Sequence, residues 1–270
     1  MKLICKALNF PRSTYYKALV SVPSNREIEA NKLKLEINNI WLESKSRYGA
    51  PKIYKILIQQ GKKVSLRRVQ RYMSAMQIRS IVVKKFRYHS EKVTSNEKDN
   101  LLNRDFTTTS INQKWCTDIT YIHTSKDGWT YLASVMDLHS KKIIGYAYDI
   151  SMTTDLAIKA VDNACLNVKH TEGIILHSDL GTQYTSQSFE KYLESKGIVH
   201  SFSRKGNPYD NACIESFHSI LKKEEVNHKK YHDFQTARRA IFEFIESWYN
   251  RKRIHSAINY LTPQAAHDAA

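Results

Sequence analysis

The stretch KWCTDITYIHTSKDGWTYLASVMDL, residues 114–138, decides the fold of this chain. It contains two runs rich in β-branched and aromatic residues, over 114–122 and 129–138, and the short link between them includes Asp127-Gly128. This arrangement is typical of a β-hairpin. A third run of the same kind, KIIGYAYD over 142–149, follows after another short link. We therefore expect a three-stranded meander.

Alternating helical and apolar segments follow the third strand. A helix is expected from Thr154, and short buried strands over 174–177 and 198–203 enclose a second helix over 186–196. A third helix over about 210–225 comes next. The order of three strands, helix, strand, helix, strand and helix predicts a mixed α/β domain, in which crossover units follow the meander.

Positive charge is concentrated in the first part of the chain. The net charge is +16, and residues 1–105 contain 23 Lys and Arg against 8 Asp and Glu, whereas residues 106–270 contain 19 against 18. A basic module joined to a nearly neutral one favours nucleic acid as the partner, because binding to phosphates releases counterions. An anionic membrane surface would require a basic amphipathic helix with a bulky apolar face, and none stands out.

The basic part reads as helical, with a helix-turn-helix-like pattern over residues 48–76. Gly61 separates two short helical segments, and Ser65 can cap the second. In that second helix the apolar residues face inward while three arginines face outward. An ordinary helical hairpin with a solvated basic face is the alternative. The candidate DNA-binding residues here are Arg67, Arg68 and Arg71.

These patterns divide the chain into four parts. We expect a helical DNA-binding region over 1–87 and a polar linker over 88–110. The mixed α/β core would follow over 111–226, and a helical extension over 227–270 would complete the chain. The extension has apolar residues at steps of three and four, so we expect it to pack on the core.

Composition excludes several classes of protein. The chain is 41% hydrophobic and 25% charged, as is usual for a globular protein. It contains no apolar run of membrane-spanning length, and its start lacks the features of a secretory signal. Its four cysteines form no C-x-x-C pair, so neither a zinc site nor a disulfide framework is predicted. We expect a cytoplasmic protein with reduced thiols.

Three acids occupy notable positions in the predicted domain. Asp118 lies in the first strand, Asp179 follows the fourth strand directly, and Glu215 lies in the helix after the fifth. If they converge at one edge of the sheet, their charges repel one another unless cations lie between them. Oxygen ligands without Cys or His favour Mg²⁺ or Mn²⁺. Singly, each acid is more simply a strand, turn or helix-surface residue, and spacing alone is weak evidence.

The residues around these acids carry a specific resemblance. The segments WCTDITYI, HSDLGTQYTS and GNPYDNACIESFHSILKKE resemble the three catalytic blocks of second-reading-frame (OrfB) transposases of insertion-sequence family three. That family belongs with retroviral integrases to the DDE superfamily, whose core has a ribonuclease H-like fold. Its pattern of Asp, Asp, 35 residues, Glu and a basic residue seven positions later corresponds here to Asp118, Asp179, Glu215 and Lys222.

The resemblance covers nearly the whole chain. Tyr249-Asn250-Arg251, His255-Ser256 and Thr262-Pro263 are similar to the family's C-terminal signature, and RYGAPKIYKIL is similar to its N-terminal helix-turn-helix-like region. The departures are Leu180, where Gln is common, and Cys116, where Thr or Ser is usual. Neither departure removes a predicted ligand.

The resemblance implies a transposase that cuts DNA at the ends of an insertion sequence. The freed 3′-hydroxyl would then attack another phosphodiester. Asp118, Asp179 and Glu215 would be the catalytic residues and would hold two Mg²⁺ ions, with Mn²⁺ as a substitute. Retroviral integrases have a His/Cys zinc module that this sequence lacks, so no zinc is expected.

The implied partners are double-stranded DNA, at the terminal repeats and at the target, and further copies of the chain on that DNA. Lys222 shares a helix face with Glu215 and would contact DNA near the metal ions. Basic residues of the C-terminal signature, Arg251, Lys252 and Arg253, are further candidate DNA contacts. An upstream reading frame would supply a partner or a fusion segment. No membrane is involved, and the protein would associate with the bacterial nucleoid.

Other residues near the acids have simpler expected roles. His218 lies three residues after Glu215, on the same side of the helix, and is as well explained by packing. His177 is expected to be a buried strand-end histidine. Asp210 and Asn211 should cap the helix that carries Glu215. Trp115 and Trp248 are expected in the core, and Asp137 has no assigned role.

Two alternative functions are compatible with these patterns. The first is a non-catalytic DNA-binding regulator or a domesticated transposase, which would bind DNA without joining strands. The second is a structure-specific nuclease on the same fold, which would hydrolyse DNA with water. The intact set of three acids argues against the first alternative.

Overall fold

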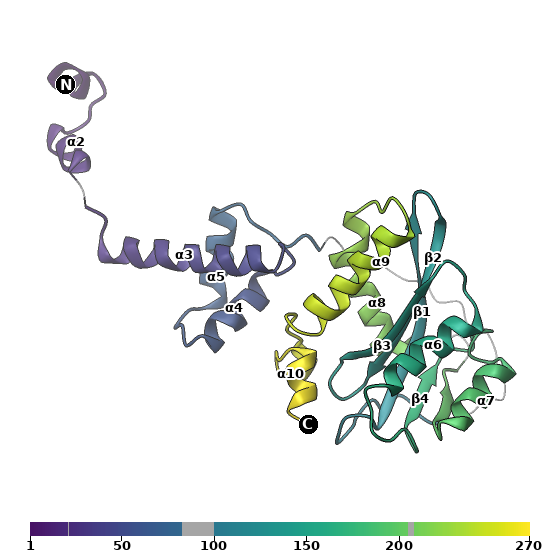
Figure 1. Ribbon diagram of the computed structural model, residues 1–270. Helices are drawn as coiled ribbons and strands as arrows, with labels where there is room; N and C mark the ends of the chain where they lie inside the picture. Colours follow the sequence, from purple (N-terminus) through teal and green to yellow (C-terminus); the bar gives the residue numbers. More distant parts are fainter. Residues whose placement is uncertain (21, 83–99, 205–207) are drawn as a thin grey trace. The chain divides into compact units, whose positions relative to one another are not determined.

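The computed structural model describes residues 1–20, 22–82, 100–204 and 208–270 (Figure 1). The chain forms two compact units, Met1–Ile81 and Val82–Ala270. Each unit has its own buried apolar residues, so each is described by itself. In the described parts, no helix combines the length and hydrophobicity that crossing a bilayer requires.

The N-terminal unit is helical, as the sequence predicts. Its helices are α1 (Lys2–Ala7), α2 (Arg12–Leu19), α3 (Asn25–Glu43), α4 (Ala50–Gln59) and α5 (Leu66–Ala75). The last three pack against one another, and α4 and α5 form the helix-turn-helix-like pair. The Ser65 hydroxyl accepts a hydrogen bond from the Arg68 amide at 3.3 Å, which confirms the predicted cap of α5. Gly61 adopts φ +77° in the link between α4 and α5, a conformation that favours glycine.

The second unit is built on a five-stranded sheet. Its strands are β1 (Lys114–Thr124), β2 (Gly128–Asp137), β3 (Ile143–Asp149), β4 (Ile175–Ser178) and β5 (Val199–Phe202). Their spatial order is β3-β2-β1-β4-β5, and β1 to β3 form the predicted antiparallel meander. β4 pairs in parallel with both β1 and β5. The mixed α/β domain expected from the sequence is therefore confirmed.

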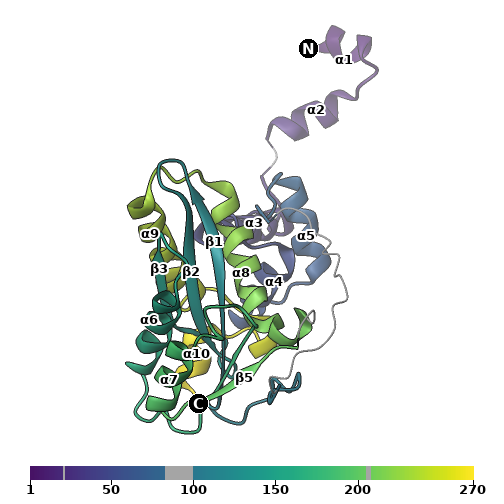
Figure 2. The same ribbon diagram turned by 90° about the vertical axis from the view of Figure 1, so that its right-hand side faces the viewer.

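Helices cover both faces of this sheet, which Figure 2 shows nearly edge-on. On one face, α6 (Thr154–Cys165) and α7 (Gln187–Ser195) enclose an apolar core that includes Trp115 and Leu176. On the other, α8 (Ala212–Glu224) contacts β1 and β2. Gly145 in β3 permits close packing of α6, because a Cβ atom there would lie 2.4 Å from the carbonyl oxygen of Ala160.

The C-terminal extension packs onto the same unit. A short 3₁₀-helix η2 (Val226–His228) leads to α9 (Phe234–Phe242), which continues as a π-helical segment η3 (Glu243–Tyr249). The last described elements are a 3₁₀ turn η4 (Ser256–Ile258) and α10 (Pro263–Asp268). Earlier in this unit, a short 3₁₀-helix η1 (Pro208–Asn211) precedes α8. The expected core positions of Trp115 and Trp248 are confirmed, since both side chains are buried.

The predicted linker falls partly outside the described residues, which resume at residue 100. From there the chain lies against the core. Leu102 is buried, and its amide donates to the Ser201 hydroxyl at 3.2 Å. The side chain of Asn100 donates to Asp210 at 2.9 Å. Residues 100–102 are thus attached to β5 and to the turn before α8.

Candidate active site

Two of the three acids lie where β1 and β4 separate. These parallel strands pair only over three positions, and the last pair is Cys116 with His177. Asp118 and Asp179 each lie two residues beyond that pair, so they occupy equivalent positions at the same edge. Neighbouring strands are about 4.8 Å apart. The topology therefore brings together two residues that are far apart in the chain.

Asp118 is held by contacts on both sides of its carboxylate. One oxygen accepts a hydrogen bond from the amide of Ile119 at 2.8 Å. The other lies 3.2 Å from Nδ1 of His218, whose Nε2 lies 3.4 Å from the Ser134 hydroxyl. His218 is buried on α8, and so it links that helix to β1 and β2. Packing alone does not account for it, because both ring nitrogens have polar neighbours.

Asp179 is the turn residue at the end of β4. Its Oδ1 accepts a hydrogen bond from the amide of Gly181 at 2.9 Å, as in an Asx turn. A Cβ atom on Gly181 would lie 2.9 Å from that same oxygen, so glycine is required by space. The carboxylate is nevertheless exposed at the end of β4. It closes the turn and remains partly accessible to solvent.

Glu215 lies in the first turn of α8 and is exposed. Partial burial raises its pKa, and the negative charges of Asp118 and then Asp179 raise it further. Burial likewise raises the pKa of Asp179, with a further contribution from Asp118. The three carboxylates therefore interact electrostatically at one edge of the sheet. In the absence of a cation, this arrangement disfavours simultaneous ionisation.

The acids do not form a closed ligand cluster. Within the described residues, no three His, Cys, Asp or Glu side chains are close enough together to hold a metal ion. Asp118 and Asp179 each use one oxygen in a local hydrogen bond to the backbone. Mutual repulsion keeps like charges apart, whereas a divalent cation would reduce that repulsion. The carboxylate oxygens fit the preference of Mg²⁺ for hard ligands.

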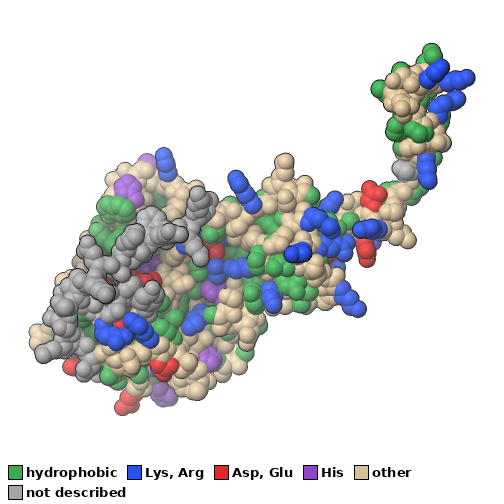
Figure 3. Space-filling view, turned by 180° about the vertical axis from the view of Figure 1, so that it is seen from behind, with side chains coloured by type: hydrophobic (Ala, Val, Ile, Leu, Met, Phe, Trp, Pro, Cys, Tyr) green, Lys and Arg blue, Asp and Glu red, His purple; other side chains and the backbone are tan. Residues whose placement is uncertain are grey.

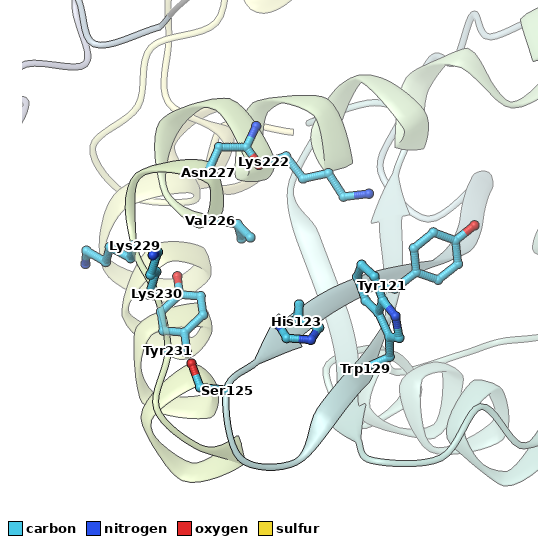
Figure 4. A pocket seen from close by; sticks show the side chains of 10 residues that line it. All are labelled: Tyr121, His123, Ser125, Trp129, Lys222, Val226, Asn227, Lys229, Lys230 and Tyr231. Atoms are coloured by element: carbon cyan, nitrogen blue, oxygen red, sulfur yellow. The ribbon is translucent and has the colours of Figure 1, made fainter.

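Lys222 borders this edge from the same helix. Its ammonium lies 5.2 Å from the centre of the Tyr121 ring, a cation–π distance. Burial lowers its pKa, and the negative charge of Asp118 opposes that shift. Figure 4 shows the side chain extending from α8 towards Tyr121, along a groove that also contains Trp129.

Two of the three predicted arginines of the N-terminal unit contact the same tyrosine. Arg67 and Arg71 are exposed, and Arg68 is half-buried. The Nε of Arg68 donates to the Tyr72 hydroxyl at 3.2 Å, and both Arg68 and Arg71 lie over the Tyr72 ring. Hydrogen bonding to Arg68 lowers the pKa of Tyr72. Figure 3 shows Lys and Arg side chains on the helices of this unit.

One of the three basic residues predicted in the C-terminal signature does not face solvent. Arg251 and Lys252 are exposed. The Arg253 side chain is only 9% exposed, and its guanidinium makes a bidentate ion pair with the buried Glu224, with its Nη2 at 2.9 Å from Oε1. The expectation that Arg253 contacts DNA is therefore corrected. Its charge is used internally, where it connects the C-terminal segment to α8.

Asp210 also differs from expectation. It does not cap α8, whose N-cap is Asn211 without a side-chain cap. The Asp210 carboxylate is buried and accepts hydrogen bonds from Arg204 and Arg104. Burial acts to raise its pKa, but the arginines hold that pKa at about 2. Arg104 lies 106 positions earlier in the chain, and no local sequence pattern indicates such a contact.

Two further polar residues have structural roles. His177 is buried, as expected, and its ring nitrogens lie 2.9 and 3.0 Å from the hydroxyls of Ser201 and Ser203. Asp137, which had no predicted role, is buried and accepts hydrogen bonds from the amides of Asn112 and Ser140. Asp137 thus stabilises the turn after β2.

Comparison with known families agrees with this geometry. The Integrase core domain matches residues 108–208, a second Integrase core domain family matches residues 196–263, and the HTH-like domain matches residues 28–86. The transposase of insertion sequence IS904 from Lactococcus lactis is 37% identical over 243 residues, which cover 90% of this chain and 96% of that protein. Transposase InsF of IS3A from Escherichia coli is 34% identical, over 98% of this chain and 92% of that protein.

Solved structures with similarity to the chain include a viral intasome and an integrase catalytic core domain. The simian T-cell lymphotropic virus intasome, in complex with PP2A regulatory subunit B56 gamma, is 17% identical with a TM-score of 0.48, over 84% of this chain and 73% of that chain. The HTLV-2 integrase catalytic core domain in complex with magnesium is 17% identical with a TM-score of 0.46, over 60% and 99%. The domain matches and the similarity to the IS904 and IS3A transposases show that the chain belongs to the IS3 family of insertion-sequence transposases, which are DNA-joining enzymes with an integrase core domain on a ribonuclease H-like fold.

Proposed function

We propose that this transposase catalyses Mg²⁺-dependent DNA cleavage at insertion-sequence ends, followed by strand transfer. In the second step, a 3′-hydroxyl attacks a phosphodiester of the target and displaces a 3′-oxygen. The observation that supports this proposal is the electrostatic interaction of Asp118, Asp179 and Glu215 where β1 and β4 separate. Such coupled carboxylates are typical of functional sites.

The three carboxylates would be the protein ligands of the metal ions. When bound, two Mg²⁺ ions would activate the attacking oxygen and stabilise the leaving oxygen, with Mn²⁺ as a substitute and no zinc. His218 would keep Asp118 oriented through its 3.2 Å contact. Lys222 would hold a phosphate close to Asp118, because its ammonium lies on the same side of α8 as Glu215.

The DNA-binding surface would be formed by exposed and half-buried basic residues on both units. In the N-terminal unit these are Arg67, Arg68 and Arg71, which would contact phosphates more than bases. In the second unit they are Arg251 and Lys252, together with Lys222. Pairing two DNA ends would require a homo-oligomer on DNA, and an upstream reading frame would supply a partner or fused segment. Association with the nucleoid would follow from this DNA binding.

A strand-transfer assay tests the proposal. The substrate is DNA with the ends of the chain's own element and a labelled 3′-end, incubated with plasmid and Mg²⁺. Asp179→Asn should abolish joining because it removes one ligand charge, while binding to DNA persists and weakens as salt rises. Asp155→Asn, an exposed change in the first turn of α6, is the matched control and should leave joining intact.

Each alternative function predicts a different result. Substantial joining by the Asp179→Asn variant would refute the assigned role of the acids. Cleavage by the wild-type chain that adds water and never joins strands would identify a nuclease. Binding of element ends without any Mg²⁺-dependent cleavage would identify a regulator.

A further inference from the structure

A groove lies along the open edge of β1, next to the acids. Since β4 pairs with β1 only as far as Cys116, the described structure leaves the following part of this edge without a parallel strand until Thr124, which bridges to Tyr231. The groove occupies this interval and has a volume of about 590 Å³. That volume lies within the range of about 300–1,000 Å³ found for small-ligand sites.

One wall of the groove is aromatic. Tyr121 and His123 are two positions apart in β1, so they lie on the same face of the strand. Trp129 of β2 is the strand partner of His123. The Trp129 ring lies edge-on to both, with centroid distances of 5.1 Å to His123 and 6.1 Å to Tyr121. Tyr121 is 53% exposed and Trp129 is 58% exposed. The cluster therefore presents separate aromatic rings along this wall, which Figure 4 labels.

The opposite wall is cationic. Lys222 extends over Tyr121 from α8, and Lys229 and Lys230 come from the segment after η2. Lys229 is paired with Glu225, so Lys222 and Lys230 provide most of the available positive charge. Among the described residues that line the groove, none is acidic. The wall thus favours an anion.

An aromatic surface beside ammonium groups matches the two parts of an unpaired nucleotide. A base can stack on an aromatic ring only when its own π-face is free, and in duplex DNA both faces are covered by neighbouring base pairs. The phosphates of the same strand would attract the lysines. The chemistry of the groove therefore distinguishes a single strand from a duplex.

We propose that this groove binds unpaired nucleotides of the reacting DNA, with bases stacked on Trp129 and Tyr121 and phosphates against Lys222 and Lys230. The inference rests on the proposed function, because that function brings DNA to the adjacent acids. Lys222 connects the two sites, since it lies over Tyr121 and interacts electrostatically with Asp118. A strand in the groove would approach the acids along β1.

Binding of a short, labelled oligothymidine to the full chain tests the proposal. The measurement is fluorescence anisotropy in EDTA, which excludes metal-dependent chemistry. Trp129→Ala should weaken binding by about 5- to 150-fold, the effect of losing one base–aromatic stack. Trp129→Phe should retain most of the affinity because it keeps a ring. Phe242→Ala is the control, since Phe242 is 57% exposed outside this groove.

An abasic strand of equal length separates stacking from charge. The effect of Trp129→Ala should disappear on that strand, because only the phosphates remain. Intrinsic fluorescence gives a second readout: of the four tryptophans, Trp115 and Trp248 are buried, Trp41 is partly buried and Trp129 is exposed, so most of the quenching of the wild-type chain by oligothymidine should come from Trp129 and any remainder from Trp41. That quenching should be lost in Trp129→Phe even though binding persists. The comparison of quenching between wild type and Trp129→Phe tests whether oligothymidine contacts Trp129, even if Trp129→Ala fails to fold.

The outcomes distinguish this proposal from the catalytic one. Asp179→Asn should bind and be quenched like the wild type, because it leaves the groove unchanged. Equal oligothymidine affinity of wild type and Trp129→Ala would overturn the inference, as would an equal loss on the abasic strand or absence of wild-type quenching. These results would leave the strand-transfer proposal standing if joining still depended on Asp179.

Discussion

Replacing Arg253 with methionine should destabilise the second unit, because the Glu224 carboxylate would remain buried without the ion pair and the hydrogen bonds that Arg253 provides. The Glu224 side chain is 4% exposed, and Arg253 donates three hydrogen bonds to it at 2.9 to 3.2 Å. Removing one partner of a buried ion pair typically costs about 3–5 kcal/mol. The indole of Trp248 still donates to Glu224 at 2.9 Å, so we expect a loss near 3 kcal/mol, the lower end of that range.

Thermal unfolding followed by near-UV circular dichroism measures this loss. For domains of 150–250 residues, 1 kcal/mol shifts Tm by about 2–4 °C, so Arg253→Met should lower Tm by roughly 6–12 °C. The neighbouring Arg251 is exposed, and Arg251→Met should change stability by less than about 0.5 kcal/mol. The double variant Glu224→Leu/Arg253→Met should recover much of the loss, because no unpaired buried charge remains.

DNA binding of the same variants gives the complementary result. Below its unfolding temperature, Arg253→Met should bind DNA nearly as well as the wild type, whereas Arg251→Met should bind more weakly. The reasoning would be refuted by an unchanged Tm for Arg253→Met together with a marked loss of DNA affinity. That combination would mean that Arg253 turns outward to phosphate in solution.

Two other substitutions test the packing of α6 and the role of Asp210. Gly145→Ala should lower the urea midpoint of unfolding, because the new Cβ atom would lie 2.4 Å from the Ala160 carbonyl oxygen. Such overpacking costs about 1–3 kcal/mol. An unchanged midpoint would show that α6 can move away freely. Asp210→Asn should destabilise the chain by roughly 1–2 kcal/mol at neutral pH, because Arg104 and Arg204 are both 46% exposed and solvent weakens their attraction. The pKa of Asp210 lies below its ordinary value of 3.8, so its contribution is complete above about pH 4 and is lost as pH falls towards about 2. Urea midpoints across this range should converge for wild type and Asp210→Asn, and a constant gap would contradict the assignment.

The local elements of this fold were predictable from short stretches of sequence. Runs rich in β-branched and aromatic residues identified β1 and β2, and Asp127-Gly128 identified the link between them. Ser65 identified the start of α5, because a cap depends on residues three positions apart. The segments around Asp118, Asp179 and Glu215, together with the spacing of the three acids, identified them through the family resemblance. These signals are local or have a fixed spacing, so they can be read without coordinates.

Only the tertiary structure decided which distant residues meet. It placed His218 against Asp118, paired Arg253 with Glu224, and joined Asp210 to Arg104 across about a hundred positions. Composition does not predict these contacts, because a charged side chain has the same local signature whether it faces solvent or a buried partner. The choice depends on how strands and helices pack around it, since burial makes an unpaired charge costly and selects the geometry that neutralises it.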